Sequence, residues 1–330
     1  MLNFKKKYYF IILVILLLVS FYVGLLLGSS NLSIKESFYY LFNSSSDDIT
    51  ADIIWKIRIP RLILGVLVGS GLAACGAAFQ GLFRNPLAEP YTLGISSGAS
   101  LGVSISVILG FSGVFIPFYA FIGSFISVFF VYTLASRKNF LNSTVILLGV
   151  IISFLFSSIV YLIFSLAKPQ EVHNIIMWLM GDLSSANNLT IIITAILVIL
   201  GIFTLIFFSE DLNILTLGDE KAFSLGVNPE RTKRILFIAS SFITGSCVAA
   251  SGIIGFVGII IPHISRKLIG VNHRYLIPSS ALIGAIFLVL SDTIARIIIK
   301  PMELPVGVIT GIIGGVFFLS LLLKTDSRDF

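Results

Sequence analysis

The sequence contains few charged residues. Asp, Glu, Lys and Arg make up 12% of the 330 residues, whereas about 25% is usual in a soluble domain. Hydrophobic residues make up 57%, and the mean hydropathy is +1.05. This shortage of charge excludes an ordinary soluble enzyme and indicates a chain that lies within a membrane.

The sequence also lacks the motifs of the common chemistries. It has no G-x-x-x-x-G-K-[ST] phosphate loop and no H-E-x-x-H metal site, and its three histidines are scattered. The two cysteines, Cys75 and Cys247, lie inside apolar runs, where they are expected to pack as small side chains. These absences predict a non-catalytic chain that binds no metal and no cofactor of its own.

The apolar residues fall into runs of about twenty, the length that crosses a ~30 Å hydrocarbon core. Because a backbone in lipid must satisfy its own hydrogen bonds, each run is predicted to be a helix. The first run follows three lysines, as in a secretory signal, but no small-residue cleavage site follows the run. It is therefore expected to be a retained helix. Between Gly252 and Gly255, one kinked helix or two shorter helices both fit. The sequence therefore predicts a single all-α domain, residues 1–330, a polytopic membrane bundle with ten spans: 8–28, 58–82, 92–110, 113–135, 143–167, 189–208, 233–252, 254–268, 276–298 and 306–323.

The basic residues set the expected orientation. With the N-terminus in the cytoplasm, 15 of the 22 lysines and arginines fall in cytoplasmic segments, as the positive-inside rule requires. An even number of spans then places the C-terminus in the cytoplasm as well. The basic residues sort by loop and form no groove, which argues against a nucleic-acid partner. The seven others fall outside or at outer helix ends: Lys35, Lys56, Arg58, Arg61, Lys168, Arg296 and Lys300.

Small residues recur at every fourth position in several spans. A ladder of this kind leaves a groove along one helix face, so a neighbouring backbone can approach closely. The ladders predict a tightly packed bundle. They comprise Gly65, Gly69, Ala73, Ala77 and Gly81; Gly94, Gly98 and Gly102; Gly149, Ser153 and Ser157; and Gly307, Gly311 and Gly315.

Away from the helix ends, the only charges inside the predicted spans are Asp292 and Arg296, in the ninth span. Their spacing of four residues allows an ion pair along one helix face. A proton-coupled transporter normally needs a chain of carboxylates or histidines within the membrane, and a single Asp does not provide one. Energy for transport is therefore expected to come from another subunit.

The polar connection at 209–232, between the sixth and seventh spans, is the most informative inner loop. Gly218 and Gly226 bracket a segment of about two helical turns, and Asp219 and Glu220 lie in its first turn, where the helix dipole favours negative charge. A second short helix is possible after Asn228. The segment fits either a docking element for a partner or a plain connection. Its apolar contacts are expected from Ala222, Phe223 and Leu225.

A set of motifs in fixed order resembles the FecCD-type permeases of ABC importers for iron-siderophores, haem and cobalamin. Any one motif is weak, but the ordered set covers nearly the whole chain, from about residue 50 to 320. Its blocks are Arg58-Ile-Pro-Arg61, Gly69-Ser-Gly-Leu-Ala73, Gln80, Arg84-Asn-Pro-Leu-Ala-Glu-Pro90, Leu93-Gly-Ile-Ser-Ser-Gly-Ala99, Trp178-Leu-Met-Gly181, Leu217-Gly-Asp-Glu220 with Leu225-Gly-Val227, Gly255-Phe-Val-Gly258, Pro262-His-Ile-Ser-Arg266, Asp292-Thr-Ile-Ala-Arg296 and Glu303-Leu-Pro-Val-Gly307.

The resemblance implies partners and site residues. The partners are a second permease subunit (the same chain or a paralogue), an extracytoplasmic binding protein and two cytoplasmic ATPase subunits that hold ATP and Mg²⁺. Arg58, Arg61 and Arg296 match arginines that receive acidic residues of the binding protein, and guanidinium groups at an outer surface would suit that role. Asp292 would orient Arg296. The ATPase-coupling residues correspond to Leu217, Gly218, Asp219, Glu220, Ala222, Leu225 and Gly226, and a second inner loop contains Arg84, Asn85 and Pro86.

The expected function is therefore that of a permease in a prokaryotic cytoplasmic membrane, working by alternating access. An ion-coupled secondary transporter is the alternative. The sequence identifies neither the transported ligand nor the residues that line its pathway.

Overall fold

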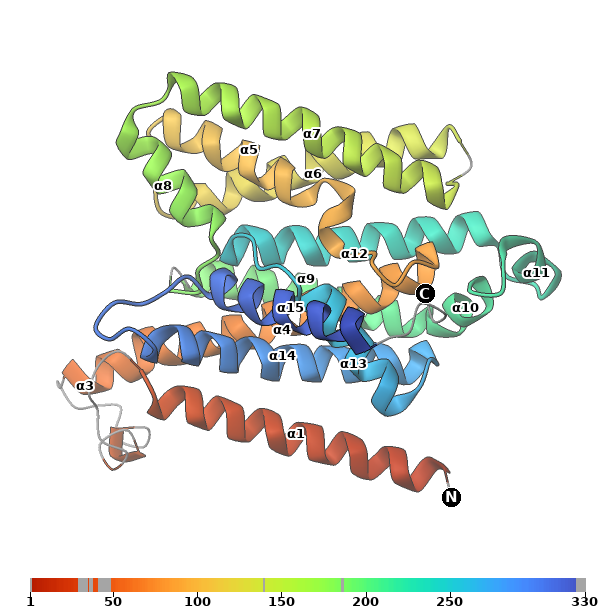
Figure 1. Ribbon diagram of the computed structural model, residues 1–330, viewed down its shortest axis with the longest axis horizontal. Helices are drawn as coiled ribbons and strands as arrows, with labels where there is room; N and C mark the ends of the chain where they lie inside the picture. Colours follow the sequence, from red (N-terminus) through yellow and green to blue (C-terminus); the bar gives the residue numbers. More distant parts are fainter. Residues whose placement is uncertain are drawn as a thin grey trace.

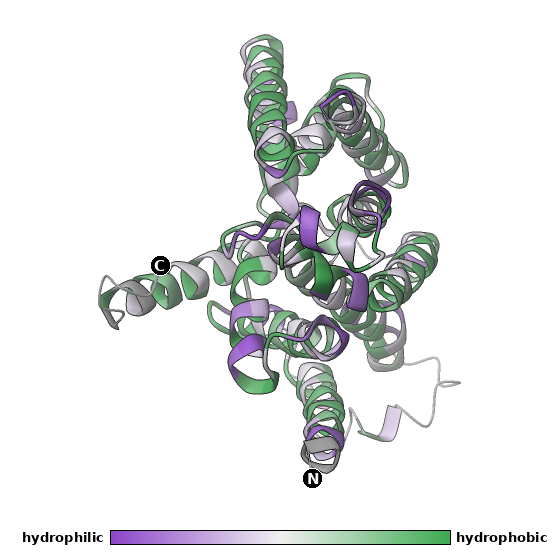
Figure 2. Ribbon diagram, turned by 90° about the vertical axis from the view of Figure 1, so that its right-hand side faces the viewer, coloured by the Kyte–Doolittle hydropathy of each residue, from purple (hydrophilic) through white to green (hydrophobic). Residues whose placement is uncertain are grey.

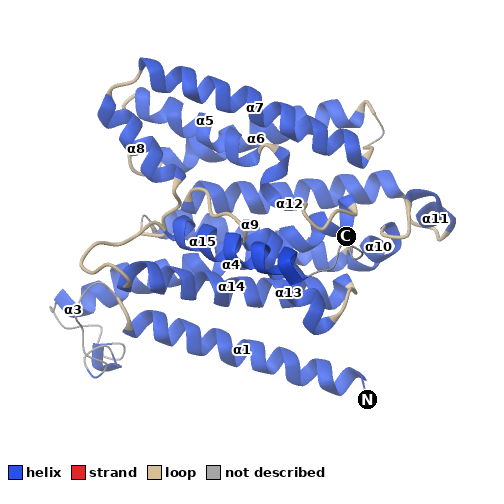
Figure 3. Cartoon of the chain, viewed as in Figure 1, coloured by secondary structure: helices blue, strands red, loops and turns tan. Residues whose placement is uncertain are grey.

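The computed structural model describes residues 2–28, 35, 38–40, 49–138, 140–184 and 187–324. Arg328, expected in a cytoplasmic tail, lies outside the described residues. The described part of the chain is all-α and contains no strand (Figure 3). Its helices are α1 (Leu2–Leu26), α3 (Ile49–Asp52), η1 (Ile53–Arg58), α4 (Ile59–Phe83), η2 (Pro90–Leu93), α5 (Ile95–Ile108), α6 (Phe115–Ser136), α7 (Asn142–Leu166), α8 (Pro169–Leu179), α9 (Asn188–Phe207), α10 (Ser209–Leu215), α11 (Asp219–Ser224), α12 (Pro229–Ser251), α13 (Val257–Ile269), α14 (His273–Ile297) and α15 (Val306–Lys324).

The predicted all-α membrane bundle is confirmed, and each of the ten expected spans contains a helix. Within the described residues, seven helices are long and apolar enough to cross a membrane. Helices α5, α13 and α15 are shorter or less apolar, so ten crossings stay a prediction. Near Gly252, where one kinked helix or two shorter helices both fit the sequence, the chain forms two helices, α12 and α13. The sequence reasoning missed α8 and α10.

The expected second short helix after Asn228 is wrong. Helix α12 begins directly at Pro229, because the Asn228 side chain accepts a hydrogen bond from the Arg231 backbone N–H at 3.0 Å and Pro229 suits a first helical turn. The chain therefore passes from α11 straight into a membrane helix.

Helix α4 lies at the centre of the bundle (Figure 1). It packs most extensively on α14 and also contacts α9, α12 and α13, while α1 covers the far side of α14. Helices α5, α6 and α7 form a second group at the top of Figure 1. Helix α1 begins, and α15 ends, toward the end of the bundle that carries α10 and α11, while α3 and η1 lie at the opposite end.

Small residues allow the helices to touch backbone to backbone. A Cβ added at Gly69 of α4 would lie 2.3 Å from the Gly284 carbonyl oxygen of α14, and one added at Gly98 of α5 would lie 2.4 Å from that of Gly123 in α6. These contacts confirm the close packing predicted from the ladders. The last ladder is only partly used, because Gly311 on α15 meets nothing within 4 Å.

The connection after α4 folds back into the bundle. A Cβ added at Gly258 would lie 2.5 Å from Pro90 and 3.3 Å from the carbonyl oxygen of Leu72, which is eleven residues before the end of α4. At 1.5 Å per residue, that contact lies about 16 Å from the end of α4, measured along the helix axis. The Tyr91 hydroxyl donates to the Ile254 carbonyl (2.9 Å) and accepts from the Ile254 N–H (3.2 Å). The connection is therefore a re-entrant segment that is tied to the break between α12 and α13.

Candidate functional site

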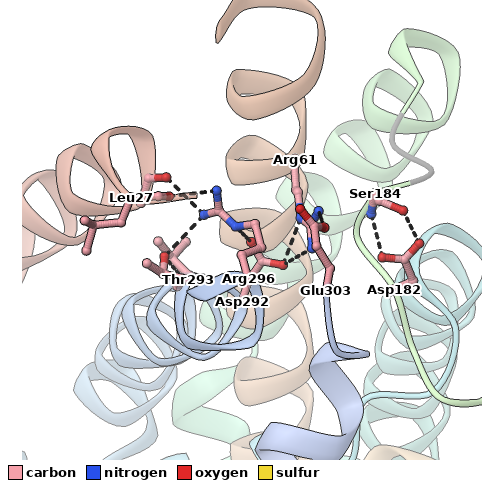
Figure 4. A network of polar contacts seen from close by, with 10 residues as sticks. Leu27, Arg61, Asp182, Ser184, Asp292, Thr293, Arg296 and Glu303 are labelled. Carbon is pink, nitrogen blue, oxygen red and sulfur yellow. Dashed lines mark hydrogen bonds and ion pairs between the residues drawn. The ribbon is translucent and has the colours of Figure 1, made fainter. Parts of the chain in front are cut away.

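Polar side chains gather at the end of the bundle where α1 and α14 end and α4 begins (Figure 4). Residues 49–83 form one continuous apolar helical stretch through α3, η1 and α4, so Arg58 and Arg61 are held three positions apart on a rigid element. Helix α14 supplies Asp292 and Arg296 on adjacent turns. We call these four residues and Glu303 the arginine cluster.

Two carboxylates pair with arginines of this cluster. Asp292 Oδ1 lies 2.9 Å from both Nε and Nη2 of Arg61, and Asp292 Oδ2 lies 3.0 Å from Arg296 Nε. Glu303 Oε2, on the connection between α14 and α15, accepts from Arg61 Nη1 at 2.5 Å. The expected pairing of Asp292 with Arg296 is present, and Asp292 also holds Arg61.

The cluster also caps α1. Arg58 Nη1 donates to the Leu25 carbonyl at 2.6 Å, and Arg296 donates to the carbonyls of Gly24 and Leu27, both at 3.0 Å. The last carbonyls of a helix have no partner inside the helix, and cations at this end also interact favourably with the helix dipole. Two of the three arginines therefore fix the end of α1 to the bundle.

The three guanidinium groups are buried at this end of the bundle and not exposed on its surface. Arg58, Arg61 and Arg296 are only 4%, 5% and 3% exposed, because helix carbonyls and two carboxylates surround them. Their role in docking a binding protein stays a prediction. Three cations and two carboxylates still leave the cluster with a net charge of +1 (3 − 2), which favours an additional anionic partner.

The opposite end of the bundle contains a second polar site. Asp219, the first residue of α11, accepts from Arg84 Nη2 at 3.1 Å and from Lys233 Nζ at 2.5 Å. Gly218 precedes it with φ +114°, a conformation that favours glycine. Arg84 follows α4, and Lys233 is buried in the first turns of α12. This Asp219 junction therefore joins the two predicted inner loops.

Helix α11 presents apolar side chains to the outside. Leu217, Phe223 and Leu225 are exposed, Phe223 by 72%, and Glu220 is exposed beside them. Among the three residues expected to supply apolar contacts, only Ala222 packs inward. Exposed apolar side chains among charged ones are typical of a protein interface.

The remaining predicted inner-loop residues shape the turns. The Asn85 side chain accepts from the Leu87 backbone N–H at 2.9 Å, and Pro86 is exposed. Gly226 ends α11 with φ +85° and has open space around it. These residues hold the turn geometry and carry no charge.

Two partners were missed by the sequence reasoning as site residues. Glu303 pairs with an arginine 242 positions away, and no local pattern indicates a pairing over that distance. Lys233 was assigned only to the cytoplasmic charge count. Its position at the predicted start of the seventh span is the one sequence signal of a buried cation, which would need a carboxylate partner.

Glu89, in the re-entrant segment, gives a pH-dependent prediction. It is half-buried, and burial raises the pKa of its carboxyl from 4.5 to about 7. Between these values the folded protein holds a proton that the unfolded chain has released, so stability falls as pH rises through this range. We expect Glu89→Gln to remove the decline, so that its melting temperature exceeds wild type by a few degrees at about pH 8 but not at about pH 5. Thermal unfolding in detergent across this pH range checks the prediction.

Glu220→Gln, at an exposed carboxylate, is the control and should keep the wild-type dependence of melting temperature on pH. A pH dependence of Glu89→Gln that runs parallel to that of wild type would contradict the prediction.

Long apolar helices, with a buried ion network at one end of the bundle and a short exposed helix at the other, define a polytopic membrane protein. Among the described residues, no group of three or more His, Cys, Asp or Glu could hold a metal ion.

Residues 16–324 match the FecCD transport family, and the chain belongs to it. It is 39% identical over 307 residues to the hemin transport system permease protein HmuU of Yersinia pestis, covering 91% of this chain and 92% of that protein. It is 36% identical over 319 residues to the iron(3+)-hydroxamate import system permease protein FhuG of Bacillus subtilis, covering 93% and 94%. A solved metal-chelate type ABC transporter in an inward-facing conformation is 31% identical, with a TM-score of 0.85 and coverage of 95% of this chain and 98% of that chain. The chain is therefore an ABC importer permease and a multi-pass protein of the cytoplasmic membrane.

Proposed function

We propose that this chain imports an iron-siderophore, haem or cobalamin-type ligand by alternating access. Two cytoplasmic ATPase subunits would drive it, an extracytoplasmic binding protein would deliver the ligand, and a second permease subunit would complete the pathway. The observation that carries the proposal is the pair of sites at opposite ends of one bundle: the positively charged arginine cluster and the exposed helix α11. The similarity to a hemin permease, HmuU, and to an iron(3+)-hydroxamate permease, FhuG, supports haem and iron-siderophores within this ligand class.

The Asp219 junction supports a coupling role for α11. Asp219 joins α11 to the end of α4 through Arg84 and to α12 through Lys233. A push on α11 by an ATPase subunit would therefore reach two of the most buried helices of the bundle. The ATPase would bind to the exposed side chains of Leu217, Phe223 and Leu225.

The exposed side of helix α15 favours the proposal of a second permease subunit. It projects from the bundle in Figure 2, and neither Gly311 nor Gly315 has an atom within 4 Å of its added Cβ. Glycines at four-residue spacing favour close approach of another membrane helix. We infer that α15 of a second subunit, identical or paralogous, approaches this side.

The main energy source is expected to be ATP. Among the described residues, Asp292 is the one carboxylate deep in α14, and it is held between two guanidinium groups. A carboxylate fixed in this way is poorly suited to carry protons for an ion-coupled secondary transporter.

Mass spectrometry of the intact complex tests the assembly. We expect the tagged chain, co-expressed with its neighbouring genes and extracted in mild detergent, to purify with two ATPase subunits and a second permease. The measured mass distinguishes a homodimer from a heterodimer. A chain that purifies alone and transports on an ion gradient would contradict the proposal and favour the secondary transporter.

A further inference from the structure

Each nitrogen of the Arg61 guanidinium group has a carboxylate partner, and the side chain is only 5% exposed. Nε and Nη2 lie against Asp292, and Nη1 donates to Glu303. Figure 4 shows the two carboxylates on either side of this group. Because the side chain is so deeply buried, the most direct way for a carboxylate of a binding protein to reach Arg61 is to replace one of these two.

Asp292 is not the exchangeable partner. Its side chain is 2% exposed, it projects from the rigid helix α14, and it pairs with Arg296 as well as Arg61. Its departure would leave two buried cations without their shared carboxylate, which is strongly unfavourable.

Glu303 has the opposite properties. Its side chain is 33% exposed, and it lies on the connection between α14 and α15 rather than in a helix. Its neighbour Met302 is 66% exposed. The exchange of Glu303 for an incoming carboxylate keeps one anion on Arg61 Nη1, so its electrostatic cost is small.

We propose that Glu303 is an internal competitor at the docking site: it occupies the place on Arg61 that an acidic residue of the binding protein takes, and docking exchanges the two carboxylates. This inference rests on the proposed function, in which Arg61 receives such a residue. Displacement of Glu303 raises the net charge of the remaining cluster from +1 to +2, which strengthens its attraction for the incoming carboxylate.

The exchange has a consequence for the pathway. Glu303 precedes the first residue of α15, Val306, by three positions. The next residue, Gly307, packs on the end of α8 and the break before α13, since its added Cβ would lie 2.3 Å from the Met180 carbonyl oxygen and 2.8 Å from that of Ile253. Release of Glu303 therefore frees one anchor of the segment that positions α15.

The test measures docking and segment mobility in the purified complex. The binding protein encoded with the complex is titrated against wild type and Glu303→Gln. A nitroxide at Met302→Cys reports the mobility of the segment, since both native thiols are buried. We expect Glu303→Gln to bind about 3–10-fold more tightly. Docking should increase nitroxide mobility in wild type, whereas in Glu303→Gln mobility should be high already.

Control variants separate the possible failures. Asp52→Asn removes a nearby carboxylate that pairs with Lys56 in solvent, and its affinity should stay within about twofold of wild type. Equal tightening in Asp52→Asn would overturn the exchange, because the effect would then be general electrostatics.

Unchanged or weaker docking of Glu303→Gln would also overturn the exchange, provided that Arg61→Glu abolishes docking. If Arg61→Glu docks normally, the proposed docking function itself fails. Glu303→Asp, which keeps the charge, should dock like wild type if the variants fold alike, and tightening by Glu303→Asp equal to that of Glu303→Gln would contradict competition.

Discussion

Asp292→Asn is expected to destabilise the protein by about 3–5 kcal/mol. The variant keeps the shape of the side chain but removes the carboxylate shared by two buried guanidinium groups. Breaking a buried ion pair from one side is costly because the remaining charge stays out of water without compensation. The hydrogen bonds that Arg296 then keeps go to neutral groups, the carbonyls of Gly24 and Leu27 and the Thr293 hydroxyl. Thermal unfolding of the purified protein should show a midpoint lower by about 10 °C.

A double-variant cycle checks the cause of this loss. Arg296→Gln combined with Asp292→Asn should cost less than the sum of the two single substitutions, because it removes the uncompensated cation as well. Asp52→Asn, at an ion pair exposed by 61% and 72%, should change stability by less than about 1 kcal/mol. Additive costs in the cycle would show that the two side chains are not coupled.

Asp219→Asn is expected to separate ATP hydrolysis from uptake. The substitution removes the carboxylate that links α11 to Arg84 and to the buried Lys233. Without these ion pairs, a displacement of α11 no longer moves α4 and α12 as one unit. We expect uptake by the assembled complex to fall at least about tenfold while hydrolysis persists. Both rates are measured on the same proteoliposomes.

Glu230→Gln is the matched control for Asp219→Asn. Glu230 pairs with Arg234 within α12 on the same end of the bundle, so its loss breaks no connection between elements. Its uptake should stay within about twofold of wild type. Equal losses in both variants would assign the effect to surface charge, and normal transport by Asp219→Asn would contradict the coupling role.

The sequence predicted the helices well because membrane spans follow from length and hydropathy alone. The failures have local physical causes. Helix α8 is short and mixes polar and apolar residues, so it resembles a loop on a hydropathy scale. The segment 84–94 appears as an inner loop in sequence, because its return into the bundle depends on contacts of Pro90 and Tyr91 with residues more than 160 positions away.

Most residues of the site were predictable, except Glu303 and Lys233, but its geometry was not. The resemblance identified the arginines and the residues of α11, and the charge pattern placed them at opposite ends. Burial of Arg61 between Asp292 and Glu303 depends on tertiary packing, as does the contact of Asp219 with Lys233. Neither could be obtained from spacing along the chain.

Uptake into proteoliposomes tests whether this permease works as an ATP-driven importer. The purified complex is reconstituted and supplied in turn with a ferric hydroxamate, hemin and cobalamin, each with the binding protein. We expect uptake of one of these ligand classes. This uptake should require ATP on the side of α11 and the binding protein on the side of the arginine cluster, and it should be insensitive to ionophores. Uptake by the permease alone, driven by an ion gradient and abolished by ionophores, would contradict ATP-driven import.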